Sequence, residues 1–284
     1  MPDAQTSPGP RAGQAHAGVS DVLAVTVVVL AGGKPDPALT GAPLPKAFAP
    51  LCGRTMVEFV LDALRGTNRT RRIILVGPET PPPALAAVVD VTVRERGGLL
   101  ENLAAALAEL PGDAPVLAVA ADVPLLTPLA VSAFLDAALA LDADIVYGVV
   151  PRADVMRVYP DARKTFVRLR DGVFTGGSLV LLRPRAFERA RPVLERAIRA
   201  RKRPWDLARL FGPATLLGLA TGRLRISGLE ARVATIAGVR ARAVICHEPE
   251  IAVDVDRAED LVLAEGWLTA QAVASHGTEA GEHR

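Results

Sequence analysis

One stretch near the N-terminus limits the possible folds more than any other. An apolar, valine-rich run at residues 22–30 is followed directly by Ala31, Gly32 and Gly33. Such a run is typical of a strand that is buried on both faces of a parallel sheet. The two glycines let the backbone approach a ligand closely and leave N–H groups free to face an anion. Together with Lys46, which follows a short way downstream, the stretch predicts a phosphate site.

Two common nucleotide-binding motifs are absent from this stretch. No Gly-Lys-Ser/Thr follows at the spacing of a Walker P-loop, and the G-x-G-x-x-G spacing of dinucleotide-binding folds is missing. The chain is rich in arginine, and its only lysines are Lys34, Lys46, Lys164 and Lys202. A lysine beside a glycine loop therefore stands out as a compact positive charge.

The rest of the chain alternates strand and helix patterns. Residues 55–64 place Met56, Val57, Val60, Leu61 and Leu64 on one face of an amphipathic helix. We expect further strands at 72–76, 91–93, 115–120, 144–150 and 241–245, and helices at 99–110, 127–141, 184–222, 229–236 and 258–265. This order predicts an α/β fold with a single Rossmann-like, mostly parallel sheet flanked by helices.

One segment departs from that alternation. Residues 163–169 and 175–182 have strand patterns and are separated by a turn at Asp171 and Gly172. They predict a hairpin-like insertion rather than another strand-helix-strand unit.

The length and composition are those of one domain with a large core. A chain of 284 residues with 50% hydrophobic content can bury such a core, and we assign it to residues 21–268. Residues 1–20 and 269–284 are expected to be disordered tails, because they offer no apolar periodicity.

The charge and the apolar segments exclude several partners. A formal net charge of +2, spread along the chain, argues against nucleic acid. The apolar run before the glycines is too short to span a membrane and lacks the flanks of a signal peptide. Cys52 and Cys246 resemble buried thiols of a reducing compartment. We therefore expect a cytoplasmic protein without a membrane partner.

A carboxylate follows the clearest strand of the chain. Asp122 comes just after the strand at 115–120, and open α/β sheets bind their ligands beyond the carboxyl ends of such strands. Thr127 and Pro128 then have the pattern of an N-cap and a first helical residue.

Four elements in this order resemble a known family. They are Leu30-Ala31-Gly32-Gly33 with Lys46, then Ala121-Asp122-Val123-Pro124-Leu125-Leu126, then Thr175-Gly176-Gly177-Ser178, and finally Asp254-Val255-Asp256 with the residues up to Leu261. The set is similar to the nucleoside-triphosphate transferases related to molybdenum-cofactor guanylyltransferase, within the nucleotide-diphospho-sugar transferase superfamily. The resemblance covers about residues 22–265. It implies transfer of a nucleoside monophosphate from a nucleoside triphosphate to a phosphorylated small-molecule acceptor, with release of pyrophosphate.

The resemblance also implies roles for individual residues. Lys46 and Asp122 are the expected catalytic residues. Mg²⁺ is expected to be held by Asp122 together with Asp256 or, as the alternative, Asp254. The nucleotide is bound by Leu30, Ala31, Gly32, Gly33, Lys46, Gly77, Gly98 and Asn102. Two alternatives stay open: Asp256 and Glu259 also form a capping box for the final helix, and Gly98 and Asn102 also suit a plain turn and helix start.

The acceptor is expected at the third element. Glycines admit a close ligand and cations hold an anionic group, so the expected acceptor residues are Arg163, Lys164, Arg168, Thr175, Gly176, Gly177 and Ser178. The alternative is a twisted hairpin whose charges are solvated.

One departure from the family pattern concerns the glycine loop. Most members carry Arg-Met-Gly between the double glycine and the lysine, whereas this chain has a proline-rich loop at residues 34–45. Either Lys34 or Arg54 could supply the missing charge. The base, the acceptor and the oligomeric state stay open, as do two other functions: a glycosyltransferase that uses a nucleotide-sugar, and a non-catalytic nucleotide-binding regulator.

Overall fold

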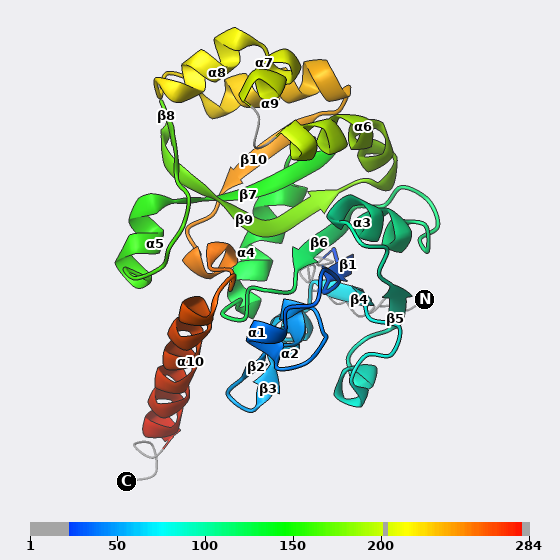
Figure 1. Ribbon diagram of the computed structural model, residues 1–284, viewed down its shortest axis with the longest axis vertical. Helices are drawn as coiled ribbons and strands as arrows, with labels where there is room; N and C mark the ends of the chain where they lie inside the picture. Colours follow the sequence, from blue (N-terminus) through cyan, green and yellow to red (C-terminus); the bar gives the residue numbers. More distant parts are fainter. Residues whose placement is uncertain (1–22, 201–203, 280–284) are drawn as a thin grey trace, which may run out of the picture.

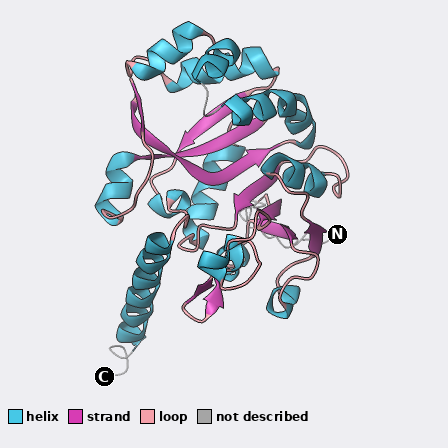
Figure 2. Ribbon diagram, in the orientation of Figure 1, coloured by secondary structure: helices cyan, strands magenta, loops and turns pink. Residues whose placement is uncertain are grey.

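The structure of the protein is a computed structural model, and it describes residues 23–200 and 204–279. The predicted N-terminal tail lies outside these residues, as do residues 280–284. Within them, one mixed sheet forms the centre of the molecule, with helices on both faces (Figures 1 and 2).

The sheet is mostly parallel, as the alternation of strands and helices predicts. Its strand order is β10-β7-β9-β6-β1-β4-β5, and β8 pairs with β9 at the side. The strands are β1 (Val25–Leu30), β4 (Thr70–Gly77), β5 (Val91–Arg94), β6 (Val116–Ala120), β7 (Ile145–Pro151), β8 (Val167–Leu169), β9 (Gly172–Leu182) and β10 (Ala241–Ile245). A separate two-stranded hairpin joins β2 (Pro50–Leu51) to β3 (Arg54–Thr55).

Two layers of helices cover the sheet. On one face α2 and α4 pack over the strands, and on the other face α3 and α6 do so. The helices are α1 (Pro37–Thr40), α2 (Met56–Arg65), α3 (Leu99–Leu107), α4 (Pro128–Leu139), α5 (Arg152–Val158), α6 (Pro184–Ala200), α7 (Pro204–Phe211), α8 (Pro213–Ala220), α9 (Ile226–Ala237) and α10 (Ala258–Glu279), with 3-10 turns at η1 (Lys46–Phe48), η2 (Pro83–Ala87) and η3 (Pro249–Ala252). No described helix has the length and apolar character needed to cross a membrane.

Local sequence signals account for two of the helices. The five residues of the predicted apolar face of α2 are all buried, and Thr55 with Glu58 forms a capping box at its start. At α4, the Thr127 hydroxyl accepts a hydrogen bond from the backbone N–H of Ala130, and Pro128 is the first helical residue. Both starts are confirmed, because caps are decided by neighbouring residues.

The hairpin is confirmed, but the place of its second strand differs from expectation. β9 is not an excursion from the sheet. It lies between β6 and β7 and is antiparallel to both. The long connection through α5 and β8 lets the chain re-enter the sheet in the opposite direction, which no local pattern reveals.

The C-terminal helix is longer than the sequence predicted. It continues past Glu265 to Glu279, through part of the segment that was expected to be disordered. Its first half packs on the body through Leu261, Ala264 and Trp267, and Trp267 makes an edge contact with Tyr159. Its later turns extend away from the body (Figure 1).

Candidate active site

The double glycine turns the chain at the end of β1. Gly33 has a φ of +151°, a conformation that side chains disfavour. Its N–H donates to Oε2 of Glu95 at 2.5 Å. A Cβ at Gly32 would lie 2.7 Å from the same carboxylate and 2.8 Å from the Asn102 amide nitrogen. Glycine is therefore required here by a close approach as well as by a turn.

Lys46 is held in place by the loop that precedes it. Pro35 and Pro45 form a β-bridge at the base of this loop, which brings the chain back beside the glycines. Ala47 and Phe48 are buried directly after the lysine and anchor it. The Lys46 ammonium lies 2.7 Å from Oδ2 of Asp122 and also pairs with Asp256.

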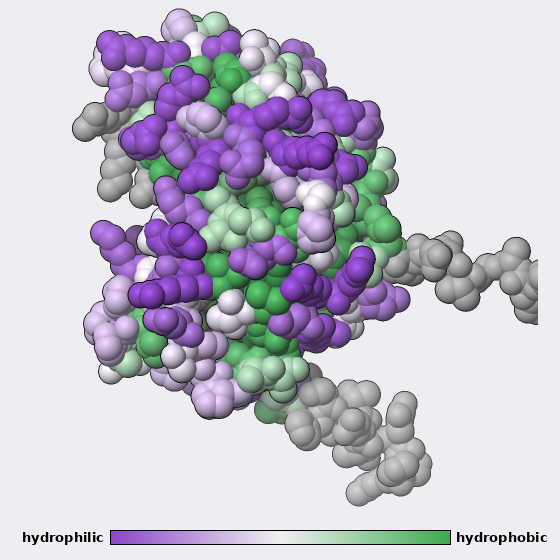
Figure 3. Space-filling model, turned by 90° about the vertical axis from the view of Figure 1, so that its right-hand side faces the viewer, coloured by the Kyte–Doolittle hydropathy of each residue, from purple (hydrophilic) through white to green (hydrophobic). Residues whose placement is uncertain are grey.

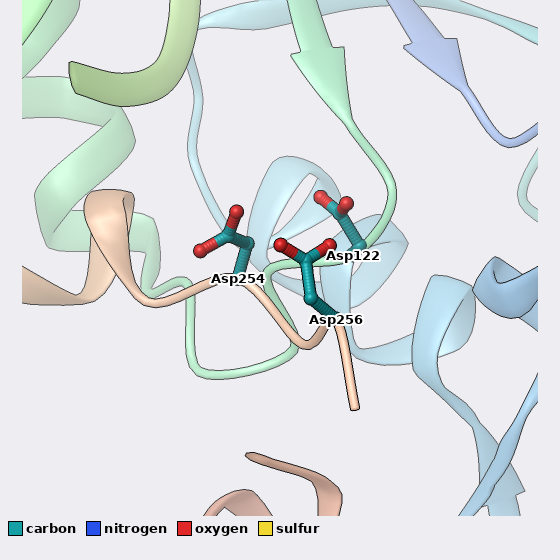
Figure 4. A group of neighbouring side chains, drawn as sticks. All are labelled: Asp122, Asp254 and Asp256. Atoms are coloured by element: carbon teal, nitrogen blue, oxygen red, sulfur yellow. The ribbon is translucent and has the colours of Figure 1, made fainter. Parts of the chain in front are cut away.

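Three aspartates converge at the end of β6 (Figure 4). Asp122 follows the strand, whereas Asp254 and Asp256 come from the loop before α10. The N–H of Val255 donates to the carbonyl oxygen of Asp122 at 2.8 Å, which ties the two loops together. One carboxylate oxygen from each aspartate lies within 4.8 Å of the others.

The cluster has the donors that a hard cation needs. Among the described residues, Oδ1 of Asp122 is buried and has no hydrogen-bond partner. An orphaned carboxylate oxygen beside two further carboxylates suits a divalent cation that prefers oxygen ligands. The residues present therefore fit the expected Mg²⁺, and all three predicted ligands lie in the cluster.

Asp260, rather than Glu259, supplies the carboxylate that caps the start of the final helix. The Asp260 carboxylate accepts hydrogen bonds from the backbone N–H groups of Asp256 and Arg257, at 3.1 and 3.0 Å. It thereby takes the capping role at the start of α10, while the side chain of Asp256 pairs with Lys46. The capping-box alternative with Glu259 is not what the structure has.

The charges of the cluster reinforce one another. Burial acts to lower the pKa of Lys46, but the charge of Asp122 and the hydrogen bonds to Asp122 and Asp256 raise it above the ordinary lysine value. The hydrogen bond from Lys46 lowers the pKa of Asp256. Burial lowers the pKa of Lys164, which pairs with Asp254, against the attraction of the nearby aspartates. At neutral pH Lys46 is therefore a cation and Asp256 an anion.

A cavity of about 260 Å³ joins the glycines to this cluster. Its lining comes from the ends of β1 and β6, from η1 and from the start of α3. The lining residues are Leu30, Gly32, Gly33, Lys46, Ala47, Gly97, Leu99, Asn102, Ala120 and Asp122. Five of the eight residues expected to bind the nucleotide thus line one cavity.

Three of the expected nucleotide-binding residues do not line this cavity. Ala31 is buried in the hydrophobic core. Gly77 is buried, and a Cβ there would make ordinary contacts with Phe48 and Ala31 in the core. Gly98 is the N-cap of α3, while its neighbour Gly97 lines the cavity. Asn102 combines both proposed roles, because it lines the cavity and its Oδ1 accepts the N–H of Arg96 at 2.6 Å.

The expected acceptor residues are divided by the structure. Lys164 reaches the aspartate cluster through Asp254. Arg163 and Arg168 are exposed, and Arg168 lies against Gly222 rather than beside the cluster. Arg54 also points elsewhere, because it pairs with Asp62 and stacks over Phe59. Of the two candidates for the missing charge, only Lys34 adjoins the glycines.

The four residues Thr175 to Ser178 lie along β9 and have different surroundings. Thr175 and Gly176 line a second, apolar cavity, whereas Gly177 is buried. A Cβ at Gly177 would lie 3.1 Å from the Ile251 side chain and 3.2 Å from the carbonyl oxygen of Gly148. Close ligand approach was expected at both glycines, but Ile251 fills the space at Gly177 and only Gly176 faces a cavity.

The comparisons agree with this geometry. Residues 27–207 match the family described as MobA-like NTP transferase domain. The chain belongs to this family. Among solved structures, a hypothetical transferase from Thermus thermophilus is 43% identical, with a TM-score of 0.76, and the match covers 84% of this chain and 100% of that one.

Two further relatives are more distant. Bifunctional protein GlmU of Rhodospirillum rubrum is 34% identical over 113 residues, so the match spans 38% of this chain but only 25% of that protein. The 2-C-methyl-D-erythritol 4-phosphate cytidylyltransferase of Thermus thermophilus is 19% identical, with a TM-score of 0.50 over 86% of this chain and 98% of that one. At that identity the likeness shows the shared fold.

The sequence reasoning missed one residue of this MobA-like domain. Glu95 holds the Gly33 amide, yet it was not among the candidates. Its position was a usable signal, because it directly follows a strand of the parallel sheet, β5, and so lies at the ligand-binding edge. What could not be read from the sequence is that its carboxylate turns toward β1.

Proposed function

We propose that the protein transfers a nucleoside monophosphate from a nucleoside triphosphate to a phosphorylated small molecule and releases pyrophosphate. One observation carries this proposal. Lys46, on the wall of a glycine-lined cavity, contacts Asp122 and Asp256 together. A cation and carboxylates at one end of an amide-lined cavity suit a triphosphate whose charge must be neutralised while its α-phosphorus reacts.

The nucleotide would lie along the cavity with its reacting end at Lys46. The nucleoside end would then meet Leu99, Asn102 and Gly97, which line the other part of the wall. The backbone amide of Gly33, which also lines this cavity, donates to the Glu95 carboxylate. For a phosphate oxygen to accept from this amide, the Glu95 carboxylate must first move away.

The bond changes need no protein base. An ionised phosphate oxygen of the acceptor attacks the α-phosphorus, a new P–O bond forms, and the bond from the α-phosphorus to the bridging oxygen breaks. Pyrophosphate leaves with the electron pair of that bond. Lys46 would stabilise the charge that grows on the leaving oxygens.

The expected cofactor fits the aspartate cluster. Mg²⁺ held by Asp122 with Asp256 or Asp254 would supply further neutralisation of the triphosphate. Because Mg²⁺ would neutralise the charges of these carboxylates, Lys46 would no longer have to pair with Asp122 and Asp256. Its ammonium group would then be available to the nucleotide. Asp256 is favoured as the second ligand because Asp256 and Asp122 both form ion pairs with Lys46 and therefore lie close together.

Pyrophosphate release tests the proposal. The protein would be incubated with each nucleoside triphosphate, Mg²⁺ and a panel of phosphorylated acceptors, with Lys46→Ala as the matched control. Release that needs the acceptor and is lost in Lys46→Ala is expected. Consumption of a nucleotide-sugar would instead indicate a glycosyltransferase, and nucleotide binding without any turnover would indicate a regulator.

A further inference from the structure

A second cavity lies under α9 at the other half of the sheet edge. Its volume is about 420 Å³, within the range of small-molecule sites. The walls come from β7, β8, β9, β10 and α9 and are almost wholly apolar. They are formed by Tyr147, Val149, Val167, Leu169, Phe174, Thr175, Gly176, Ile226, Leu229, Glu230, Val233, Ala241, Arg242 and Ala243.

The helix above this cavity is incompletely packed. Ile226, Leu229 and Val233 recur at helical spacing and face the cavity, yet each is only half-buried. In α9 only Ala237 is fully buried, and in α8 no residue is. Protein interiors are normally close-packed, so this apolar face has space left beneath it.

Strand register places both cavities on one face of the sheet. Leu30 of β1 pairs with Ala120 of β6. Val119 of β6 pairs with Leu179 of β9, and because these two strands are antiparallel, the next residue of β6, Ala120, lies beside Ser178 of β9. Side chains alternate along a strand, which puts Gly176 on the same face as Ser178. Leu30 and Ala120 line the cavity proposed for the nucleotide, whereas Gly176 lines the apolar cavity. Ser178 therefore stands between the two.

Three of the polar side chains that line the apolar cavity are either paired or partly exposed: Glu230, Arg242 and Tyr147. Glu230 accepts the N–H of Ala243 at 2.8 Å and lies 3.8 Å from Arg242. Tyr147 remains 41% exposed. A molecule with many hydroxyl groups would lose hydrogen bonds to water there without gaining enough partners. An aromatic ring or a branched hydrocarbon makes few hydrogen bonds to water, so it would lose none of consequence on entering this cavity.

The roof of this cavity is not part of the family match. The match ends at residue 207, whereas α8 and α9 lie at residues 213–237. In Figure 1 these helices cover the end of the sheet that β10 and β7 occupy. Figure 3 shows hydrophilic and apolar side chains mixed on one side of this upper part, and Leu217 on α8 is 67% exposed.

From these observations we propose that the apolar cavity under α9 binds the body of the acceptor, and that the acceptor is a phosphomonoester with an aromatic or branched-alkyl body. Its phosphate would extend past Ser178 toward the aspartate cluster and Lys164. This inference rests on the proposed function, because it assigns the acceptor of that reaction.

The test measures binding of defined phosphomonoesters by calorimetry, without nucleotide. Phenyl phosphate and isopentyl phosphate are compared with glycerol phosphate, which has a polar body. The apolar esters are expected to bind at least about tenfold more tightly, because each buried methylene contributes to affinity. Equal affinity for the three esters would overturn the inference.

Cavity variants locate the binding. Leu229→Trp should fill the cavity and remove the preference for phenyl phosphate, whereas Leu217→Trp on α8, at a side chain that is 67% exposed, should leave it unchanged. Gly176→Ala is the second variant, since its Cβ would collide with the hydroxyl group of Tyr147, which lines the cavity, and so change the shape of the cavity. A preference that survives in both Leu229→Trp and Gly176→Ala would overturn the inference.

The same variants separate this inference from the proposed function. Nucleoside triphosphate affinity, measured in parallel, should stay within about twofold in Leu229→Trp and Gly176→Ala. Pyrophosphate release with a polar acceptor but not with an apolar one would overturn the inference and leave the proposed function standing. Preference for phenyl phosphate in a protein that binds no triphosphate would overturn the proposed function, and with it the assignment of this cavity to the acceptor.

Discussion

Two cavities at the same edge of one sheet differ in almost every chemical respect. The one at β1 and β6 has a volume of about 260 Å³ and presents backbone amides, a lysine and an aspartate. The one at β7, β9 and β10 has about 420 Å³ and presents almost only apolar side chains. Charged groups near an anion stabilise it, whereas an apolar wall favours the release of water from a hydrophobic body. The difference indicates how one edge can hold two unlike substrates.

The largest effect is expected from Lys46→Ala in the charged cavity. Turnover should fall by about 10²–10³-fold, because the proposed stabilisation of the leaving pyrophosphate is lost. With Mg²⁺ present, the melting temperature should stay within about 3 °C, since the Lys46 side chain is 32% exposed and Mg²⁺ would balance the aspartates with which it pairs. Arg199→Ala on α6, at a side chain that is 70% exposed and does not line the charged cavity, is the control for loss of a positive charge. Turnover in Lys46→Ala within a few-fold of the parent protein would exclude this role.

The aspartates should differ in their effect on Mg²⁺. Asp122→Asn replaces one proposed carboxylate ligand by a neutral amide, and the Mg²⁺ concentration for half-maximal activity should rise by about tenfold or more. Asp256→Asn should raise this Mg²⁺ concentration more than Asp254→Asn does. Asp254 pairs with Lys164, whereas Asp256 and Asp122 both pair with Lys46. An identical Mg²⁺ titration for Asp122→Asn would refute the ligand assignment.

A smaller effect of opposite sign is expected at Glu95. Its carboxylate occupies the Gly33 amide and carries a charge that repels a triphosphate. Glu95→Gln should therefore tighten nucleotide binding, by about three- to tenfold in calorimetry. Binding of phenyl phosphate in the apolar cavity should not change. Weaker nucleotide binding in Glu95→Gln would show that the carboxylate contacts the nucleoside instead.

The two regions also differ in how well the sequence predicts them. In the half that contains β1, α2 and α4, neighbouring residues decide the structure, so the buried strand, the apolar helix face and the Thr127 cap could all be predicted. In the other half, the place of β9 depends on pairing with two strands distant in sequence. Register and direction of such a strand are set by tertiary packing.

The candidate site shows the same division. The convergence of Asp122 with the later aspartates followed from a family resemblance, and the structure adds the hydrogen bond from Val255 that enforces it. Gly177 was mistaken for an approach point because the sequence does not show that Ile251 covers it. The apolar cavity was not foreseen, since its walls come from five elements and its roof from helices with no motif.

The central claim is that the charged cavity transfers the α-phosphate group of a nucleoside triphosphate to an acceptor. Two parallel reactions test it, one with the triphosphate labelled at the α-phosphate and one with the label at the γ-phosphate, each with Mg²⁺ and a phosphomonoester acceptor. The account predicts that the α-label appears in the acceptor product and the γ-label in pyrophosphate, at equal amounts, and that Lys46→Ala loses both. Transfer of the γ-label to the acceptor, or release of the α-label as free nucleoside monophosphate regardless of acceptor, would contradict it.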